Sequence, residues 1–381
     1  MSSNEVKVSP DGWKQFIDPR KSKLVLLLLA IPIALYFEFI SHNYTAVFIS
    51  SLFAIMPLAW LMGRATEEIA LRVGQGLGAF LNASFGNAAE LIIVIFLLIG
   101  AKSANDAGNL DSAANLVTVV QASLIGSILG NLLLVLGLAF VWGGIKHKEQ
   151  TFSSSAVSTN SSLLILAMLA LIIPATFSQF GNHSTETIVD LSRLASIILL
   201  GLYGLFLLFQ LKTHSHLFVN STHHEEEEAA LTMKQAIILL IVSTCLVAVM
   251  AEFLVGSIEH SAEALGWPTL FIGVILIPLF GNAAEHFTAV TVAGKNKMDL
   301  SIGIAIGSST QVAVLIAPIT VLIGWMLNVN MSLQFGIFET VATFVAVLIA
   351  NSICSDGKSN WLEGSMLLGT YAILAASFWL A

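Results

Sequence analysis

The hexapeptide FGNAAE occurs twice in this chain, at residues 85–90 and again at residues 280–285. Both copies lie inside long apolar stretches, where inserting an ionisable side chain costs about 3 kcal/mol and usually serves a function. The same polar motif in two hydrophobic segments therefore predicts a duplicated fold with a functional site built from both copies.

Composition places the chain among the membrane proteins. Of its 381 residues, 56% are hydrophobic and only 10% are charged, and the mean hydropathy is +0.86. A soluble domain carries roughly 25% charged residues. Apolar runs of about 20 residues, the length of a membrane-spanning helix, recur without the alternation typical of a transmembrane β-barrel. We therefore expect an all-α integral membrane protein.

Short polar segments divide the chain into eleven hydrophobic runs, and we expect each run to be a transmembrane helix. They lie near residues 24–41, 45–63, 76–100, 112–142, 155–177, 188–211, 231–257, 268–293, 299–326, 331–350 and 361–380.

The basic residues set the orientation, because short cytoplasmic loops are enriched in lysine and arginine. With the N-terminus in the cytoplasm, only Lys102 and Arg193 of the 16 basic residues fall on the opposite side. The cytoplasmic side then also holds the segment HLFVNSTHHEEEEAALT, in which the glutamate run 225–228 follows several histidines. Such a run is usually a solvated linker, with the gathering of cations as the alternative.

Each copy of the hexapeptide is followed by a similar segment. The first continues into QASLIGSILGNLLLVLG and the second into SIGIAIGSSTQVAVLIAP, and each contains a Gly-Ser pair. Spans two to six therefore pair with spans seven to eleven, and five helices per repeat invert the second repeat. This predicts a cytoplasmic N-terminus and first helix at 1–43, a first repeat at 44–212, a linker at 213–230 and a second repeat at 231–381. Inverted repeats are typical of secondary transporters, whose substrate site lies where the repeats meet.

The hexapeptides supply the groups that a hard cation prefers. Asn87 and Glu90 are three residues apart on one helix face, and Asn282 and Glu285 repeat this spacing. The preceding Gly86 and Gly281 loosen the helix and free carbonyl oxygens. Calcium takes about six to eight oxygen ligands. We therefore expect one Ca²⁺ site with two carboxylates.

Further polar residues follow in spans four and nine. Ser127 and Asn131 lie in the first of these, and Ser308 and Gln311 lie in the second. They add oxygens to the site or serve only as hydrogen-bonding contacts between helices. His286, directly after a carboxylate, is a ligand, a proton relay or a packing residue.

Further acids lie in or near the spans. Glu67 and Glu68 occur in GRATEEIALRVG at the end of span two, and Glu252 lies in span seven. They form an ion or proton vestibule, or they lie near water at helix ends.

The motifs together resemble the CAX family of calcium/proton antiporters, within the wider cation/calcium exchanger superfamily. The resemblance rests on GRATEEIALRVG, LNASFGNAAELI, GSILGNLLLVLG, the acidic linker, and the long stretch from PLFGNAAEHF to QVAVLIAP. It implies eleven helices, one N-terminal helix followed by two inverted five-helix repeats. It also implies that Glu90, Glu285, Asn87 and Asn282 form the central calcium and proton site.

We therefore expect a calcium/proton antiporter that exchanges cytoplasmic Ca²⁺ for protons by alternating access, with the two glutamates binding either Ca²⁺ or protons. A sodium/calcium exchanger and a gated cation channel are the alternatives. An enzyme is the weakest alternative, because no nucleophile and base accompany the carboxylates.

The expected partners are Ca²⁺, protons and the lipid bilayer, and we expect neither a cofactor nor nucleic acid. The sequence leaves open whether the protein forms a homo-oligomer. The expected location is a prokaryotic cell membrane, or a vacuolar membrane if the source is eukaryotic.

Overall fold

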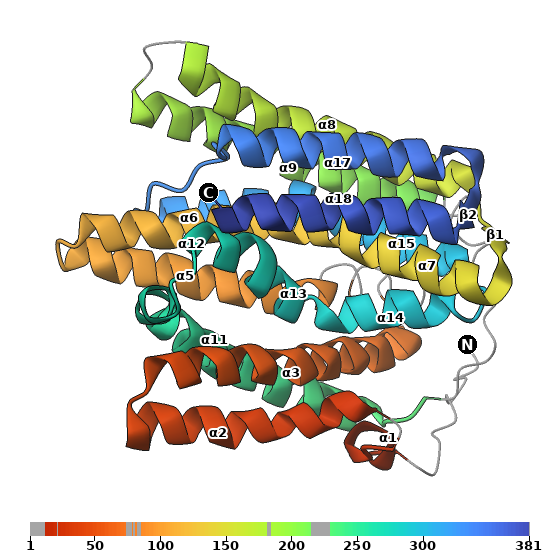
Figure 1. Cartoon of the computed structure of the whole chain (residues 1–381), viewed down its shortest axis with the longest axis horizontal. Coiled ribbons are helices and arrows are strands. Elements are labelled where there is room, and N and C mark those ends of the chain that lie inside the picture. The colour runs from red at the N-terminus through yellow and green to blue at the C-terminus, as the bar shows by residue number, and fades with distance from the viewer. Residues whose placement is uncertain are drawn as a thin grey trace.

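The computed structural model describes residues 12–20, 22–73, 78, 81, 85–180, 184–214 and 229–380. Long helices lie side by side across the molecule, with α2, α3 and α11 together along one edge (Figure 1). The elements of the first half are α1 (Lys14–Ile17), η1 (Lys23–Leu29), α2 (Ala30–Tyr36), η2 (Phe37–Ser41), α3 (Tyr44–Val73), α5 (Ala88–Asp106), α6 (Leu110–Leu129), η3 (Gly130–Val135), α7 (Leu136–His147), β1 (Glu149–Thr151), α8 (Ser154–Phe180), α9 (Thr185–Leu208) and η4 (Phe209–Thr213).

The second half begins with α11, a helix of 33 residues whose first turn is capped by Thr232 and Gln235 in a reciprocal capping box. Its elements are α11 (Met233–Leu265), α12 (Thr269–Phe271), η5 (Ile272–Leu276), α13 (Ile277–Gly281), α14 (Ala283–Ala293), α15 (Met298–Gln311), η6 (Val312–Ile316), α16 (Ala317–Met326), α17 (Ile337–Ile353), η7 (Cys354–Asp356), β2 (Lys358–Asn360) and α18 (Trp361–Leu380).

The predicted all-α membrane fold is confirmed. Within the described residues, nine helical stretches are long and apolar enough to cross a bilayer, and a bent pair, α12–α13 with α14, makes a tenth. The C-terminal helix α18 is 20 residues long but is not among them. The number eleven and the division into two five-helix repeats therefore stay predictions.

Both hexapeptides interrupt their helices at the asparagine. Asn87 has φ −95° and ψ 17° immediately before α5, and Asn282 has φ −101° and ψ 11° between α13 and α14. In the second copy the two helical segments meet at 60°. The sequence predicts a loosened backbone at the glycine, and the structure breaks the helix one residue later. The same break in both copies gives the two segments the same local geometry.

Small residues allow segments from the two halves to approach closely. A Cβ atom at Gly126 in α6 would collide with the carbonyl group of Val274 in η5. Next to it, a Cβ atom at Gly273 would lie 2.5 Å from the Cβ of Ala122. These contacts lie within the large apolar core that runs through the bundle.

The strands β1 and β2 pair in antiparallel fashion at one end of the bundle (Figure 1). They join the α7–α8 connection to the segment before α18, with Gln150 opposite Ser359. Lys358 Nζ donates to Glu149 Oε1 at 3.0 Å across the sheet, and this hydrogen bond raises the pKa of the exposed Lys358 ammonium. The sheet therefore ties a loop of the first half to a loop of the second.

Candidate cation site

The two motif carboxylates lie at corresponding positions on different helices. Glu90 is in the first turn of α5 and is 3% exposed, whereas Glu285 is in the first turn of α14 and is partly buried. Glu285 Oε1 lies beside Gly86, four residues before Glu90 in the chain. The structure thus brings together two acids from motifs far apart in the sequence.

A hydrogen-bonded chain links Glu90 to the second motif. Ser127 Oγ, from α6, donates to Glu90 Oε1 at 2.5 Å. Asn282 Nδ2 in turn donates to Ser127 Oγ at 3.0 Å. All three side chains are buried. The asparagine of one motif therefore orients the carboxylate of the other through a shared serine.

A second chain of hydrogen bonds surrounds Asn87. Ser308 Oγ donates to Asn87 Oδ1 at 2.9 Å, and Asn87 Nδ2 donates to Gln311 Oε1 at 2.8 Å. Asn131 Nδ2 donates to Ser308 Oγ at 3.0 Å, so that α5, η3 and α15 meet at one serine. The polar residues predicted in spans four and nine thus converge with the motif asparagines.

The two motif glycines differ in their surroundings. A Cβ atom at Gly86 would lie 3.1 Å from Glu285 Oε1, so the second carboxylate rests against the backbone of the first motif. A Cβ atom at Gly281 would meet only Ile93 Cδ1, at 3.6 Å, an ordinary contact. Close approach of a carboxylate therefore requires a glycine in the first motif and not in the second.

Several oxygens at this place have no partner among the described residues. They are Glu90 Oε2, Glu285 Oε2 and Asn131 Oδ1, all of them buried acceptor atoms. A buried acceptor without a partner is costly, and two carboxylate oxygens with an amide oxygen are typical ligands of a hard cation. The described residues contain no group of three or more His, Cys, Asp or Glu side chains arranged to hold a metal. The donor set thus fits a calcium-like ion held by two carboxylates and neutral oxygens.

His286 lies beside this set without joining its hydrogen bonds. The side chain is buried, and its Nε2 atom has no partner among the described residues. Its backbone N–H donates to the carbonyl of Asn282, one turn earlier. The position is compatible with a proton relay next to Glu285 and with simple packing.

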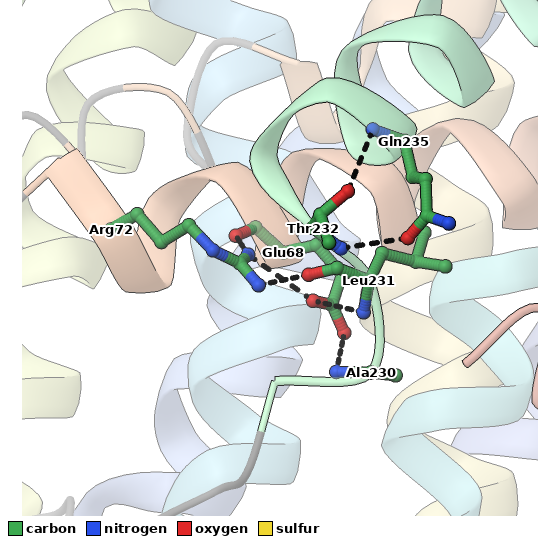
Figure 2. Close-up of polar contacts among 6 residues, drawn as sticks. All are labelled: Glu68, Arg72, Ala230, Leu231, Thr232 and Gln235. Atoms are coloured by element: carbon green, nitrogen blue, oxygen red, sulfur yellow. Dashed lines mark hydrogen bonds and ion pairs between the residues drawn. The ribbon is translucent and has the colours of Figure 1, made fainter. Parts of the chain in front are cut away.

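The acids predicted as a vestibule take no part in the hydrogen bonds described above. Glu68 is 4% exposed and accepts hydrogen bonds from the backbone N–H groups of Ala230, at 2.9 Å, and Leu231, at 3.1 Å (Figure 2). Glu67 pairs with Arg64 at 2.6 Å on the surface. The third acid, Glu252, is exposed on α11.

Glu68 and the end of the linker form a contact that the sequence analysis did not anticipate. The capping-box spacing of Thr232 and Gln235 marks the start of a helix in the sequence, but it does not indicate that Glu68 binds the segment before that helix. The glutamate run 225–228, predicted as a solvated or cation-gathering linker, lies outside the described residues.

Comparison with known families adds a relationship across most of the chain. The family model described as sodium/calcium exchanger protein matches residues 43–212 and 235–380. A Ca²⁺/H⁺ antiporter of Aphanothece halophytica is 45% identical, covering 92% of this chain and 95% of that protein. A Ca²⁺/H⁺ antiporter of Synechocystis sp. is 43% identical, covering 94% and 97%. The solved structure of native YfkE is 38% identical with a TM-score of 0.79, covering 94% of this chain and 100% of that one.

Proposed function

Because this chain belongs to the sodium/calcium exchanger protein family, we propose that it is a Ca²⁺/H⁺ antiporter that exchanges cytoplasmic Ca²⁺ for protons. The two relatives reported above, at 45% and 43% identity, carry that name. The observation that supports the proposal most strongly is the pair Glu90 and Glu285. Two buried, unpartnered carboxylate oxygens from separate motifs provide the two negative charges that balance one Ca²⁺ ion.

The surrounding residues have distinct roles in this proposal. Ser127 and Asn282 hold the Glu90 carboxylate in place, while Asn131 offers its free amide oxygen to the ion. Ser308 and Gln311 fix the orientation of the Asn87 amide. The helices break directly after Gly86 and Gly281, and backbone carbonyls freed by such breaks are further ligands in this proposal.

Competition between Ca²⁺ and protons couples the two fluxes. A carboxylate that carries a proton has lost the charge that attracts Ca²⁺, so protonated and calcium-bound forms exclude one another. Each occupied form crosses between inward-facing and outward-facing states by alternating access, as inverted repeats allow. His286 passes protons to Glu285 from the adjacent position.

Transport by the purified protein in proteoliposomes tests the proposal. With an imposed pH gradient and no sodium gradient, the wild-type protein is expected to accumulate Ca²⁺, and Glu90→Gln and Glu285→Gln are expected to abolish accumulation. Wild-type uptake by either variant would refute the role of the carboxylates. A calcium flux whose rate does not depend on the imposed pH gradient would instead support a channel.

Sodium-driven exchange is the second candidate, favoured by the name of the matching family model. Calcium uptake driven by a sodium gradient at equal pH on both sides would establish it. We expect no such uptake. Sodium ions would need oxygen sites of their own in addition to the calcium site, and the FGNAAE motifs do not indicate such sites.

The proposed location is a prokaryotic cell membrane, with the N-terminus and linker in the cytoplasm. The species of the two relatives above are in keeping with it. Labelling of an engineered surface cysteine in intact cells and in inverted vesicles would test the orientation.

A further inference from the structure

Glu68 has every carboxylate oxygen engaged at the end of the linker. Its Oε1 accepts from the N–H of Ala230, and its Oε2 accepts from the N–H of Leu231 and lies 3.3 Å from Arg72 (Figure 2). The Arg72 guanidinium also donates to the carbonyl of Leu231. The ion pair of Glu68 and Arg72 on α3 therefore binds both N–H groups and a carbonyl group of the short peptide segment that leads into α11.

This segment, residues 229–232, is called the strap below. Ala229, Ala230 and Leu231 are buried, and Thr232 caps α11. Ala230 and Leu231 also pack in a small apolar core distinct from the main one. Its other buried members are Phe16, Leu61, Ala65, Ile69, Ala236 and Leu239. The strap therefore attaches the start of α11 to the end of α3 through both polar and apolar contacts.

The opposite ends of the two helices are also joined. Ser261 Oγ of α11 donates to the carbonyl of Tyr44 at 3.2 Å, and the His260 ring lies 4.5 Å from the Tyr44 ring. Contacts at both ends fix the axial position of α11 against α3.

Each of these two helices packs against the motif helix of the other half. Phe53 of α3 contacts Phe280 of the second motif, with ring centroids 5.0 Å apart. Val255 of α11 lies beside Gly100 of α5, the helix that carries Glu90. An axial shift of α11 against α3 would therefore move Glu90 relative to Glu285.

We propose that Glu68 is a positioning residue for the cation site, which fixes the separation of Glu90 and Glu285 by fastening the strap to α3. The effect of Glu68 on Ca²⁺ transport rests on the proposed function, whereas the attachment of the strap to α3 does not. Glu68 itself does not contact the ion.

A thiol-labelling experiment tests the structural claim without any transport. Ala229→Cys, in a protein whose Cys245 and Cys354 are replaced by serine and alanine, places a reporter in the buried strap. We expect at least tenfold faster reaction with a hydrophilic maleimide in Glu68→Gln. Ala230→Pro should do the same, because it removes the donor to Oε1 and leaves the ion pair intact.

Asp106→Asn is the matched control, because Asp106 pairs with Lys102 at the same spacing on the surface. It should leave the labelling rate unchanged. Equal labelling in the parent, Glu68→Gln and Ala230→Pro would overturn the proposal.

Equilibrium binding of Ca²⁺ to the purified protein tests the consequence for the site. Glu68→Gln and Ala230→Pro should each raise Kd about tenfold, with normal elution on gel filtration. The charge swap Glu68→Arg with Arg72→Glu should not restore affinity, since arginine cannot accept the two strap N–H groups. Restoration by the swap would show that only the ion pair matters and would refute the strap mechanism. A wild-type protein without proton-driven uptake would refute the proposed function and leave the labelling result standing.

Discussion

The unequal surroundings of the two motif glycines give the sharpest prediction. Gly86→Ala places a methyl group 3.1 Å from Glu285 Oε1, so the carboxylate has to yield by a few tenths of an ångström. Gly281→Ala makes the same chemical change in the other motif, where the nearest atom is Ile93 Cδ1 at 3.6 Å. Neither glycine has a positive φ, so backbone strain does not distinguish the two variants.

The expected magnitude follows from what the carboxylate loses. A misplaced contact to a charged group costs about 1.5–3 kcal/mol. Because the Glu285 side chain shifts and stays in the site, we take the lower end, which corresponds to a roughly tenfold rise in the Kd for Ca²⁺. Alanine stabilises a helix by about 0.5–1 kcal/mol relative to glycine, and this gain is common to both variants.

Isothermal titration of the two purified variants with Ca²⁺ measures the difference. We expect Gly86→Ala to bind about tenfold more weakly than wild type and Gly281→Ala to bind within about twofold of it. Thermal unfolding should show both variants at least as stable as wild type. Equal affinities for the two variants would refute the placement of Glu285 against the first motif.

Three other predictions concern the site and its packing. If two protons compete with one Ca²⁺, the Kd for Ca²⁺ should rise about a hundredfold for each pH unit by which the pH falls through the range in which the carboxylates take up protons. In Glu285→Gln, which has one carboxylate fewer, the rise should be only about tenfold per pH unit. Equal slopes for the two proteins in Ca²⁺ titrations at a series of pH values would contradict this. Gly126→Leu should lower the free energy of unfolding by about 1–3 kcal/mol or more through overpacking, whereas Gly130→Ala, with no atom within 4 Å of the new Cβ, should not; calorimetry distinguishes them. Ser127→Ala and Asn282→Ala should be non-additive in Ca²⁺ affinity by about 0.5–3 kcal/mol, and additive effects would argue against the shared hydrogen-bonded chain.

The sequence predicted the helical class and the convergence of the motifs because both depend on patterns within the chain. Continuous apolar runs require helices in a bilayer, and two copies of FGNAAE in inverted segments predict that their side chains meet. The partners within the site were not predictable. The Asn87 amide donates to Gln311 whereas the Asn282 amide donates to Ser127, a difference that depends on side-chain packing across helices.

Helix ends and long-range polar contacts were the least predictable features. The run at 45–63 appeared to end at the charged segment GRATEE, yet α3 continues to Val73. It continues because the charges pair along the helix, as Arg64 does with Glu67. The contact of Glu68 was not predictable because the N–H groups that bind it lie far along the chain, in a segment with no pattern that indicates where it docks.

The short sheet of β1 and β2 makes the two ends of the bundle unequal. In the described parts of the chain it has no counterpart at the opposite end. Two identical inverted repeats that exchanged conformations would alternate between symmetry-related states of equal energy. If the two halves of this chain alternate as proposed, a tether at one end only would favour one of the two states. The same ion gradient applied in opposite directions should then drive transport at different rates, and the protein would act as a rectifier.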